Sequence, residues 1–222
     1  MAEISPEAAK KLATEMNEHY PAMVYAMTKR SGIIPGGFKI SSCKVVAVDS
    51  KQCELSYVAC KGDACSMPKK AIYKFYPPLN GSSVKMLQLQ SRICAPKITW
   101  LFTKPLALLI LVTCTLLSTL AMGLGVDGIM ELLQTMPRLE SKLTMVFGSA
   151  ENVGLVVVFF WIITVVAHLI ECCIAYRYCE TTLRFSNQVA SFWGILVFIV
   201  GWPVFEELKE LVEWKQLHGK KK

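Results

Sequence analysis

Three polar side chains stand just ahead of a proline: Asn17, His19 and Tyr20 precede Pro21 in a stretch with helical spacing of apolar residues. Pro21 cannot donate a hydrogen bond to the carbonyl of Asn17, and it disfavours helical dihedral angles at Tyr20. The sequence therefore predicts one of two structures. Either the helix is kinked and its polar groups form a ligand site, or Pro21 begins a second helix.

A second polar pair, His168 and Glu171, lies inside an otherwise apolar stretch. Three residues apart on a helix, the two side chains share one face. Ionisable groups are costly to place in lipid, so we expect this intramembrane pair to point toward a partner helix, a cavity or a bound ligand. The alternative is that Glu171, near the end of the stretch, reaches the lipid headgroups.

The remaining residue types do not predict catalysis. There are nine cysteines without a repeated framework, and Cys60 and Cys65 are too widely spaced for a zinc knuckle, so we expect both to be reduced thiols. The sequence contains no recognisable nucleophile–base pair, phosphate loop or metal cluster, so an enzyme is less expected than a binding protein. Its basic residues are scattered, which argues against nucleic acid as a partner despite a formal charge of +7.

The apolar residues are concentrated in the second part of the chain. Of 222 residues, 53% are hydrophobic and 18% are charged, the mean hydropathy is +0.41, and the apolar excess lies after Ile98. This predicts a soluble domain over residues 1–96, a membrane domain over 97–214 and a basic tail over 215–222. Residues 1–11 do not resemble a cleavable signal peptide, so we expect the soluble domain to face the cytosol.

The first domain is predicted to have a small α+β fold. Ser5 followed by Pro6 predicts the start of a helix, and alternating apolar residues predict three antiparallel strands over residues 38–48, 53–60 and 71–76. Ser82 can cap a last helix. We expect the apolar face of that helix to consist of Val84, Leu87, Leu89 and Ile93. The expected order is helix, three strands, helix.

Three short motifs in the first ninety residues carry a family resemblance. They are residues 16–20 (Met-Asn-Glu-His-Tyr), the turn at residues 48–49 and residues 75–79 (Phe-Tyr-Pro-Pro-Leu). Together they resemble the domain of unknown function 2470, a small α+β module of haem-utilisation proteins. The resemblance implies haem as a candidate cofactor near Asn17, because His19 or Tyr20 can ligate ferric iron. The family pattern reads Met-Asn-x-Asp-His, however, so His19 replaces the aspartate and Tyr20 replaces the histidine.

Three apolar stretches predict an all-α transmembrane bundle of about three helices. Residues 106–126 and 153–174 are long enough to cross a bilayer, and Trp100 and Lys104 are typical of its interface. Residues 189–205 are fewer, so this third stretch either spans or enters the membrane and returns. Residues 130–145 predict an interfacial helix broken at Pro137.

The second half also carries a resemblance. Its motifs are residues 168–171 (His-Leu-Ile-Glu), residues 176–177 (Tyr-Arg), Trp193, Gly201 and residues 205–208 (Phe-Glu-Glu-Leu). They resemble the uncharacterised three-span eukaryotic membrane family, domain of unknown function 4499. This resemblance implies a membrane fold and assigns no activity.

Three functional hypotheses follow. The leading one is a non-catalytic multi-pass membrane protein, a scaffold or adaptor whose cytosolic domain binds a ligand or partner. The first alternative is a haem-binding or haem-handling protein that uses His19, Tyr20 or His168 as an axial ligand, and the second is a lipid or sterol accessory protein that uses the His168 and Glu171 face. We expect the bilayer and another membrane protein or a second copy as partners, and the endoplasmic reticulum or another endomembrane as the location.

The distribution of positive charge distinguishes the two possible arrangements of the third stretch, spanning the membrane or entering it and returning. Three spans would put the lysine-rich tail on the far side of the membrane from the first domain, against the positive-inside rule. A third stretch that enters and returns removes this conflict.

Overall fold

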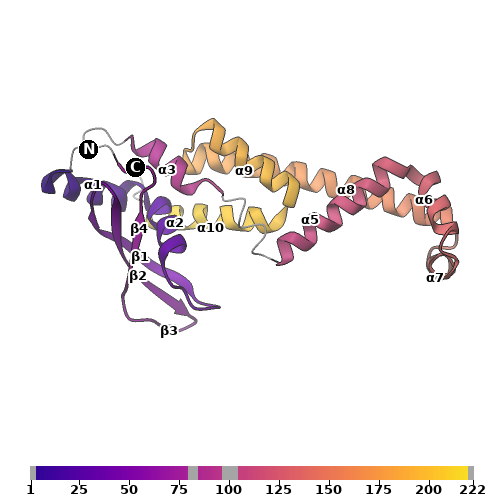
Figure 1. Cartoon of the computed structure of the whole chain (residues 1–222), viewed down its shortest axis with the longest axis horizontal. Helices are drawn as coiled ribbons and strands as arrows, with labels where there is room; N and C mark the ends of the chain where they lie inside the picture. Colours follow the sequence, from indigo (N-terminus) through magenta and orange to yellow (C-terminus); the bar gives the residue numbers. More distant parts are fainter. Residues whose placement is uncertain (1–3, 80–84, 97–104, 220–222) are drawn as a thin grey trace. The chain divides into compact units, whose positions relative to one another are not determined.

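The computed structural model describes residues 4–79, 85–96 and 105–219, which form two compact units. Unit 1 combines three parts of the chain, Met1–Ala95, Arg177–Phe192 and Glu207–Lys222, whereas unit 2 comprises Pro96–Tyr176 and Trp193–Glu206. Figure 1 labels the helices and strands along the chain. The sequence-based division at residue 96 assigned residues 177–192 and 207–214 to the membrane domain, but both stretches belong to unit 1 together with the N-terminal domain.

Two helices begin unit 1, and a proline starts each. Helix α1 is Pro6–His19, and the Ser5 hydroxyl accepts a hydrogen bond from the Ala8 N–H at 3.3 Å. Helix α2 is Pro21–Ser31. The structure confirms the Ser5 cap, and it confirms the interpretation in which Pro21 begins a new helix rather than kinking a long one.

A small antiparallel sheet follows, in which β2 pairs with each of the other strands. The strands are β1 (Lys39–Val48), β2 (Gln52–Lys61), β3 (Ala64–Cys65) and β4 (Lys69–Lys74). The three predicted strands are present, and β3 is an additional two-residue strand that extends the turn after β2. Every second side chain of β2 is buried, among them Leu55 and Tyr57, as expected for a sheet with one covered face.

Helix α3 (Met86–Cys94) closes the N-terminal domain. It buries Leu89 and Ile93 as predicted, but the prediction for Leu87 is wrong, because its side chain is 53% exposed. The buried residues Met86, Leu89, Gln90 and Ile93 are spaced three or four apart, so they form one face of the helix. This face includes the polar Gln90 in place of the predicted Leu87. Ser82 and Val84 lie outside the described residues.

Asn17 ties α1 to β1. Its side-chain amide donates to the carbonyl oxygen of Val45 at 3.0 Å and accepts from the N–H of Val45 at 2.8 Å. The register of β1 against β2 shifts between Val45 and Ala47, and at this irregular point the side-chain amide takes the role of a neighbouring strand. Both polar atoms of the Asn17 amide are therefore occupied by backbone.

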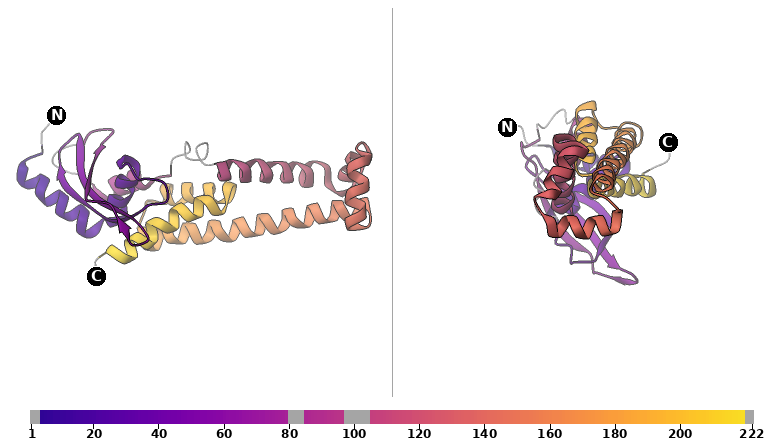
Figure 2. Two further views of the ribbon diagram at one scale, coloured as in Figure 1. Left: turned by 90° about the horizontal axis from the view of Figure 1, so that it is seen from below. Right: turned by 90° about the vertical axis from the view of Figure 1, so that its right-hand side faces the viewer.

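Unit 2 consists of helices. They are α5 (Pro105–Ser118), the π-helical stretch η1 (Thr119–Leu124), α6 (Gly125–Gln134), α7 (Pro137–Phe147), most of α8 (Ala150–Arg177) and parts of α9 (Asn187–Val200) and α10 (Trp202–His218). The break at Pro137 is confirmed. Figure 2 shows α5 and α8 side by side, and the indole N–H of Trp161 donates to the Ser118 hydroxyl at 3.2 Å. The chain turns at Gly125, and Ile129, Leu133 and Val153 then form a small core between α6 and α8.

The third predicted stretch is a helix that ends at a glycine. Helix α9 is Asn187–Val200, Gly201 has a φ of +72°, and α10 runs over Trp202–His218. The fourteen residues of α9 span about 21 Å, which is less than the roughly 30 Å of a hydrocarbon core. Residues 215–218 of the predicted basic tail belong to α10, and residues 220–222 lie outside the described residues.

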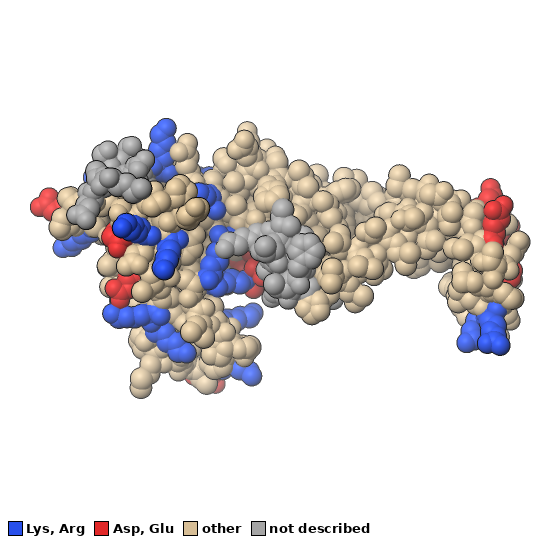
Figure 3. All heavy atoms as spheres, viewed as in Figure 1, with Lys and Arg blue, Asp and Glu red and all other residues tan. Residues whose placement is uncertain are grey.

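In the part of the chain that the structure describes, two helices are long and apolar enough to cross a membrane, Ala107–Gln134 and Ala150–Leu183. Only 6% and 11% of their most apolar windows is buried within the structure, which distinguishes them from the core helices of a soluble protein. Charged side chains cover much of unit 1 and, in unit 2, gather near the α6–α7 end (Figure 3). The structure thus has a small α+β domain and a mostly helical part with two candidate spans. Trp100 and Lys104 lie outside the described residues.

The Asn17 amide should contribute measurably to stability. In Asn17→Ala the buried Val45 loses the partner of its N–H and of its carbonyl, so we expect the free energy of unfolding to fall by about 1–3 kcal/mol. Denaturant titration of the full chain in detergent micelles measures this change. Asn17→Asp keeps the acceptor for the Val45 N–H but puts a second carboxylate oxygen against the Val45 carbonyl oxygen, so it should also destabilise the fold. A midpoint that does not move in Asn17→Ala would contradict the paired geometry.

Candidate functional site

Unit 1 contains a pocket of about 380 Å³ lined by segments from all three of its parts. The end of α1 contributes His19 and Tyr20, and α3 contributes Leu87 and Gln90. Two of the three residues predicted as a ligand site therefore line a cavity. The third, Asn17, binds strand β1 and is not among the lining residues.

One wall of the pocket is formed by the end of the second candidate span. The π-helical stretch η2 (Tyr178–Leu183) contributes Thr181 and Thr182, and the next residue, Arg184, adopts a left-handed conformation with φ 56° and ψ 44°. A residue with a side chain pays roughly 1–2 kcal/mol for this conformation. The Arg184 and Phe185 N–H groups both donate to the carbonyl of Cys179, which holds the turn. The turn thus fixes Arg184 in the pocket wall.

Lys215 of α10 completes this cationic wall. Its Nζ lies 3.5 Å from the carbonyl oxygen of Leu183, and the Gln90 amide donates to the same oxygen at 3.2 Å. Burial, together with the charge of the nearby Arg184 guanidinium, lowers the pKa of Lys215. Within the described ranges neither Arg184 nor Lys215 forms an ion pair. An anion between the two cations would therefore stabilise both.

The lining of the pocket also includes carboxylates from α1. Glu15 and Glu18 of α1 line it next to His19 and Tyr20. Burial and then the Glu15 carboxylate raise the pKa of Tyr20, so the phenol keeps its proton near neutral pH. Of the described residues that line the pocket, Leu87 alone has an aliphatic side chain. The cavity is therefore polar, and its lining has charges of both signs, with carboxylates from α1 and cations from Arg184 and Lys215.

The C-terminal helix is held on α2 by five side chains, which we call the α2–α10 clamp. The Nζ of Lys29 lies 2.5 Å from a carboxylate oxygen of both Glu207 and Glu210. The Tyr25 hydroxyl donates to Glu210 at 3.2 Å, and its ring stacks on Trp214 with the ring centroids 4.6 Å apart. Burial acts to lower the pKa of Lys29, but the two carboxylates outweigh it, so this pKa is raised. The clamp keeps an ionised ammonium between two carboxylates.

Sequence reasoning missed the clamp because its partners lie far apart in the chain. Lys29 is 178 and 181 residues from the two glutamates that it contacts. The one local signal is that Glu207 and Glu210 are three residues apart and share a face of a helix. That spacing is common on solvated helices, so it does not identify a partner.

The predicted pair in the second span lies in unit 2, where His168 contacts a helix break. Its Nδ1–H donates to the carbonyl oxygen of Phe198 at 2.8 Å, in the last turn of α9, where carbonyls lack donors from the next turn. Gly201 lies against the same ring, since a Cβ atom there would be 2.6 Å from Nε2 of His168. The Oε2 atom of Glu171 is buried and has no hydrogen-bond partner in the described part of the chain. The histidine thus binds backbone of a neighbouring helix.

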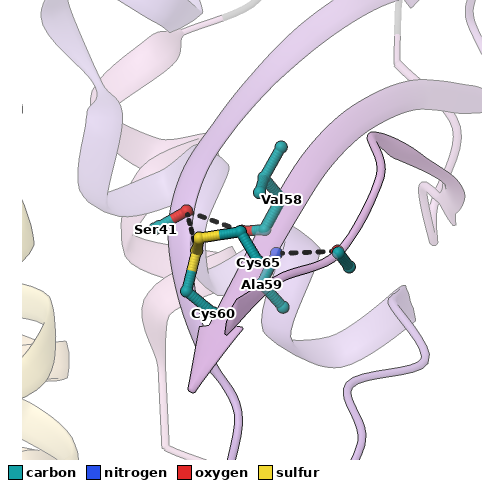
Figure 4. The surroundings of a disulfide bond; sticks show 6 residues. Ser41, Val58, Ala59, Cys60 and Cys65 are labelled. Carbon is teal, nitrogen blue, oxygen red and sulfur yellow. Dashed lines mark hydrogen bonds between the residues drawn. A yellow bond between two sulfur atoms is a disulfide. The ribbon is translucent and has the colours of Figure 1, made fainter. Parts of the chain in front are cut away.

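The prediction of reduced thiols at Cys60 and Cys65 is wrong, because the two residues form a disulfide (Figure 4). The antiparallel pairing of β2 with β3 puts these residues directly opposite each other. Sequence spacing did not reveal this, because β3 is only two residues long and has no apolar alternation. The Sγ of Cys60 also lies 3.2 Å from the hydroxyl oxygen of Ser41 on β1.

Comparison with known proteins adds no assignment. No protein family, curated protein or solved structure matches the chain. The resemblances to the two families of unknown function therefore stay predictions. Within residues 4–79, 85–96 and 105–219, no group of three or more His, Cys, Asp or Glu side chains is arranged to hold a metal ion.

Reversing one charge of the clamp should release α10 from α2. In Lys29→Glu three carboxylates would meet, so we expect the backbone amides of residues 207–218 to exchange with solvent at least about tenfold faster, equivalent to about 1.4 kcal/mol. Hydrogen–deuterium exchange of the full chain measures this rate. The swap Lys29→Glu, Glu207→Lys, Glu210→Lys should restore protection. Lys70→Glu, which removes an exposed pair with Glu54, is the control, and equal exchange in Lys29→Glu and wild type would rule out the clamp.

The turn at Gly201 should tolerate no side chain. Gly201→Ala puts a Cβ atom at a φ of +72° and against His168, so we expect the unfolding free energy to fall by about 1–2 kcal/mol from backbone strain alone, and by more from the clash. In a His168→Ala background the clash disappears and the penalty should shrink. Thermal unfolding in detergent measures both values. Gly123→Ala, where the added Cβ has its nearest neighbour at 4.0 Å, should be close to neutral.

Proposed function

We propose that this chain is a membrane-anchored adaptor without catalytic activity of its own, in which a two-span hairpin holds the ligand-binding unit 1 at one face of a bilayer. One observation carries the proposal. The chain leaves unit 1 before the first candidate span and belongs to it again at the end of the second. A folded water-soluble unit lies on one face of a membrane, so the number of crossings between these points is even. Two spans meet this condition.

The lateral surfaces of the two helices support their insertion in lipid. Helix α5 and η1 together cover twenty residues without a charged side chain, about 30 Å of helix, which matches the hydrocarbon core. Large apolar side chains on both helices remain exposed in the structure; they include Leu109, Val112, Leu116, Phe159, Phe160 and Ile163. A contiguous surface of this kind is stable only when lipid or another protein covers it.

The third apolar segment is proposed to enter the membrane and return. Residues 193–206 are preceded and followed in the chain by parts of unit 1, so they too make an even number of crossings, and their length excludes two. The turn at Gly201 reverses the chain within this segment. Carbonyls at a helix break are costly in lipid, and the bond from His168 to the Phe198 carbonyl removes one such cost. This function of His168 leaves less support for a sterol or lipid site on the same face.

Charge favours the cytosolic face for unit 1. If the chain crosses the membrane twice, most of the basic residues near the membrane lie on the same side as unit 1. Between the two spans, on the side away from unit 1, the basic residues are Arg138 and Lys142. The unit 1 side has Arg92, Lys97, Lys104, Arg177, Arg184 and the lysines at 220–222. The Cys60–Cys65 disulfide argues in the other direction, because disulfides persist in oxidising compartments. We give the charge distribution more weight, since it involves many residues near the spans.

A binding function is better supported than catalysis or haem handling. Burial raises the pKa of Cys43, Cys53 and Cys94 to about 12, so these thiols are not ionised near neutral pH and are poor nucleophiles. His19 and Tyr20 do line a cavity, as the haem hypothesis requires. The porphyrin plane needs apolar walls, however, and this cavity is lined by charged and polar side chains.

The topology is testable by labelling single cysteines in sealed vesicles. We expect tags at the two chain termini to be accessible from the same face, and a cysteine in α7, for instance Ser141→Cys, to be accessible only from the other. A cysteine at Phe198 or Ile199 should react from neither face without detergent, or only with small reagents from the unit 1 face. Carbonate at alkaline pH should leave the protein in the membrane.

Termini on opposite faces would contradict the even number of crossings, and release by carbonate would contradict insertion altogether. Thiol trapping before lysis, applied to Cys60 and Cys65, tests the orientation separately. Free thiols at both positions would show that unit 1 faces a reducing compartment, since the structure has them joined in a disulfide. Complete protection together with labelling of α7 from the cytosolic face would reverse the orientation.

A further inference from the structure

We propose that the pocket in unit 1 binds a zwitterionic phosphate ester, with its phosphate against Arg184 and Lys215 and its ammonium group toward Glu15. This ligand is the one that unit 1 binds in the proposed function. Only its source, a membrane lipid, depends on the proposed anchoring in a bilayer. The arguments concern the charge of the pocket, its donors and its position in the chain.

The cationic wall is suited to a phosphate. Arg184 presents a guanidinium, which pairs with phosphate oxygens through several hydrogen bonds, and Lys215 adds an ammonium from a different helix. Thr182 lines the same wall. The neighbouring Thr181 hydroxyl donates to the Arg177 carbonyl at 2.7 Å and so has no proton to offer. The wall therefore offers two cations and one hydroxyl to a single anionic group.

The backbone around Arg184 supports a binding function. Asparagine and glycine adopt the left-handed conformation far more readily than arginine does, and helices ordinarily end on them. Here an arginine ends η2 in that conformation, and its guanidinium lies close enough to Lys215 to lower the pKa of the Lys215 ammonium. The backbone strain at Arg184 and the repulsion between its guanidinium and the half-buried Lys215 ammonium both oppose folding. Both are consistent with a site that is completed by an anion.

The Glu15 carboxylate in the lining restricts the charge of the ligand. It would repel a phosphate monoester or polyphosphate that carries two or more negative charges. It would attract an ammonium group. A phosphodiester that also carries an ammonium group has one negative and one positive charge, and it matches the charges of both signs in the lining. At about 380 Å³ the pocket has room for a small headgroup of this kind.

The position of the pocket indicates where such a ligand comes from. Thr181 and Thr182 belong to the last turn of the candidate span Ala150–Leu183, so the cavity begins where this span ends. If the span crosses a bilayer, the pocket lies at the depth of the headgroups. An ethanolamine phospholipid then supplies the ligand directly, and a water-soluble phosphodiester is the other source of the same chemistry.

Binding to the full chain in detergent tests the site without requiring insertion. The water-soluble probe is glycerophosphoethanolamine, the lipid probe is short-chain phosphatidylethanolamine, and the comparison lipid is phosphatidylglycerol of equal chain length. We expect Arg184→Gln and Lys215→Gln each to weaken both ethanolamine probes about tenfold or more, as loss of a charged hydrogen bond implies. Lys51→Gln, an exposed lysine outside the pocket, is the matched control and should change nothing.

Glu15→Gln tests the ammonium side. It should reduce the preference for phosphatidylethanolamine over phosphatidylglycerol while leaving phosphate contacts in place. Hydrogen exchange of residues 207–218 in each variant verifies that α10 stays docked on α2. If Lys215→Gln releases α10, the variant Thr182→Val, which exchanges the hydroxyl for a methyl group, is measured instead of Lys215→Gln.

The outcomes show both whether the site exists and whether its ligand is a lipid or a water-soluble molecule. Binding of both ethanolamine probes, or of the lipid alone, supports a headgroup site, and binding of the soluble probe alone supports the site with a soluble ligand. Absence of binding by either probe, equal weakening by Lys51→Gln, or tighter binding of phosphatidylglycerol would overturn the proposal. Carbonate extraction and labelling of vesicles are unaffected by these results, so a failure here leaves the anchor function standing.

Discussion

The contact between Lys29 and the two glutamates of α10 is the interaction on which the rest of the arrangement depends. It attaches the last helix of the chain to the second, and with the stacked Tyr25 and Trp214 rings it makes unit 1 from sequence segments at both ends of the polypeptide. Because α10 is held there, Lys215 reaches the pocket wall. The same attachment requires the helices between residues 96 and 177 to lead the chain back to unit 1.

The helix break at Gly201 has a comparable role in unit 2. A glycine with a positive φ turns the chain, and a histidine from a neighbouring helix supplies a donor for a carbonyl in the last turn of α9. Polar groups are otherwise rare on the apolar helices, so a histidine in such a segment is expected to have a specific partner. Here that partner is the backbone carbonyl of Phe198. His168 therefore has an ordinary structural role.

The sequence predicted those parts of the fold that depend on local chemistry. Ser5 and Pro6, the alternation of β2, the long apolar runs and the break at Pro137 each act over a few residues, and the structure has the corresponding elements. Contacts between residues more than a hundred positions apart could not be predicted from the sequence, because no local pattern around Lys29 or Glu207 identifies the other residue as its partner. Half of the candidate site was missed for the same reason. His19 and Tyr20 were recognised from the proline that follows them, whereas Arg184 and Lys215 become neighbours only through tertiary packing. The disulfide was missed because it depends on a two-residue strand, which has no periodicity to detect.

The separation of 178 residues between Lys29 and Glu207 also has a consequence for biosynthesis. Helix α2 leaves the ribosome long before α10 has been made. At about 5–20 residues per second the interval is on the order of ten to thirty-five seconds. During that time the α2 surface that later contacts α10 has no native partner, and Tyr25 is exposed to solvent or to a chaperone. Emergence of α10, rather than emergence of the first ninety residues, is the event that completes the domain.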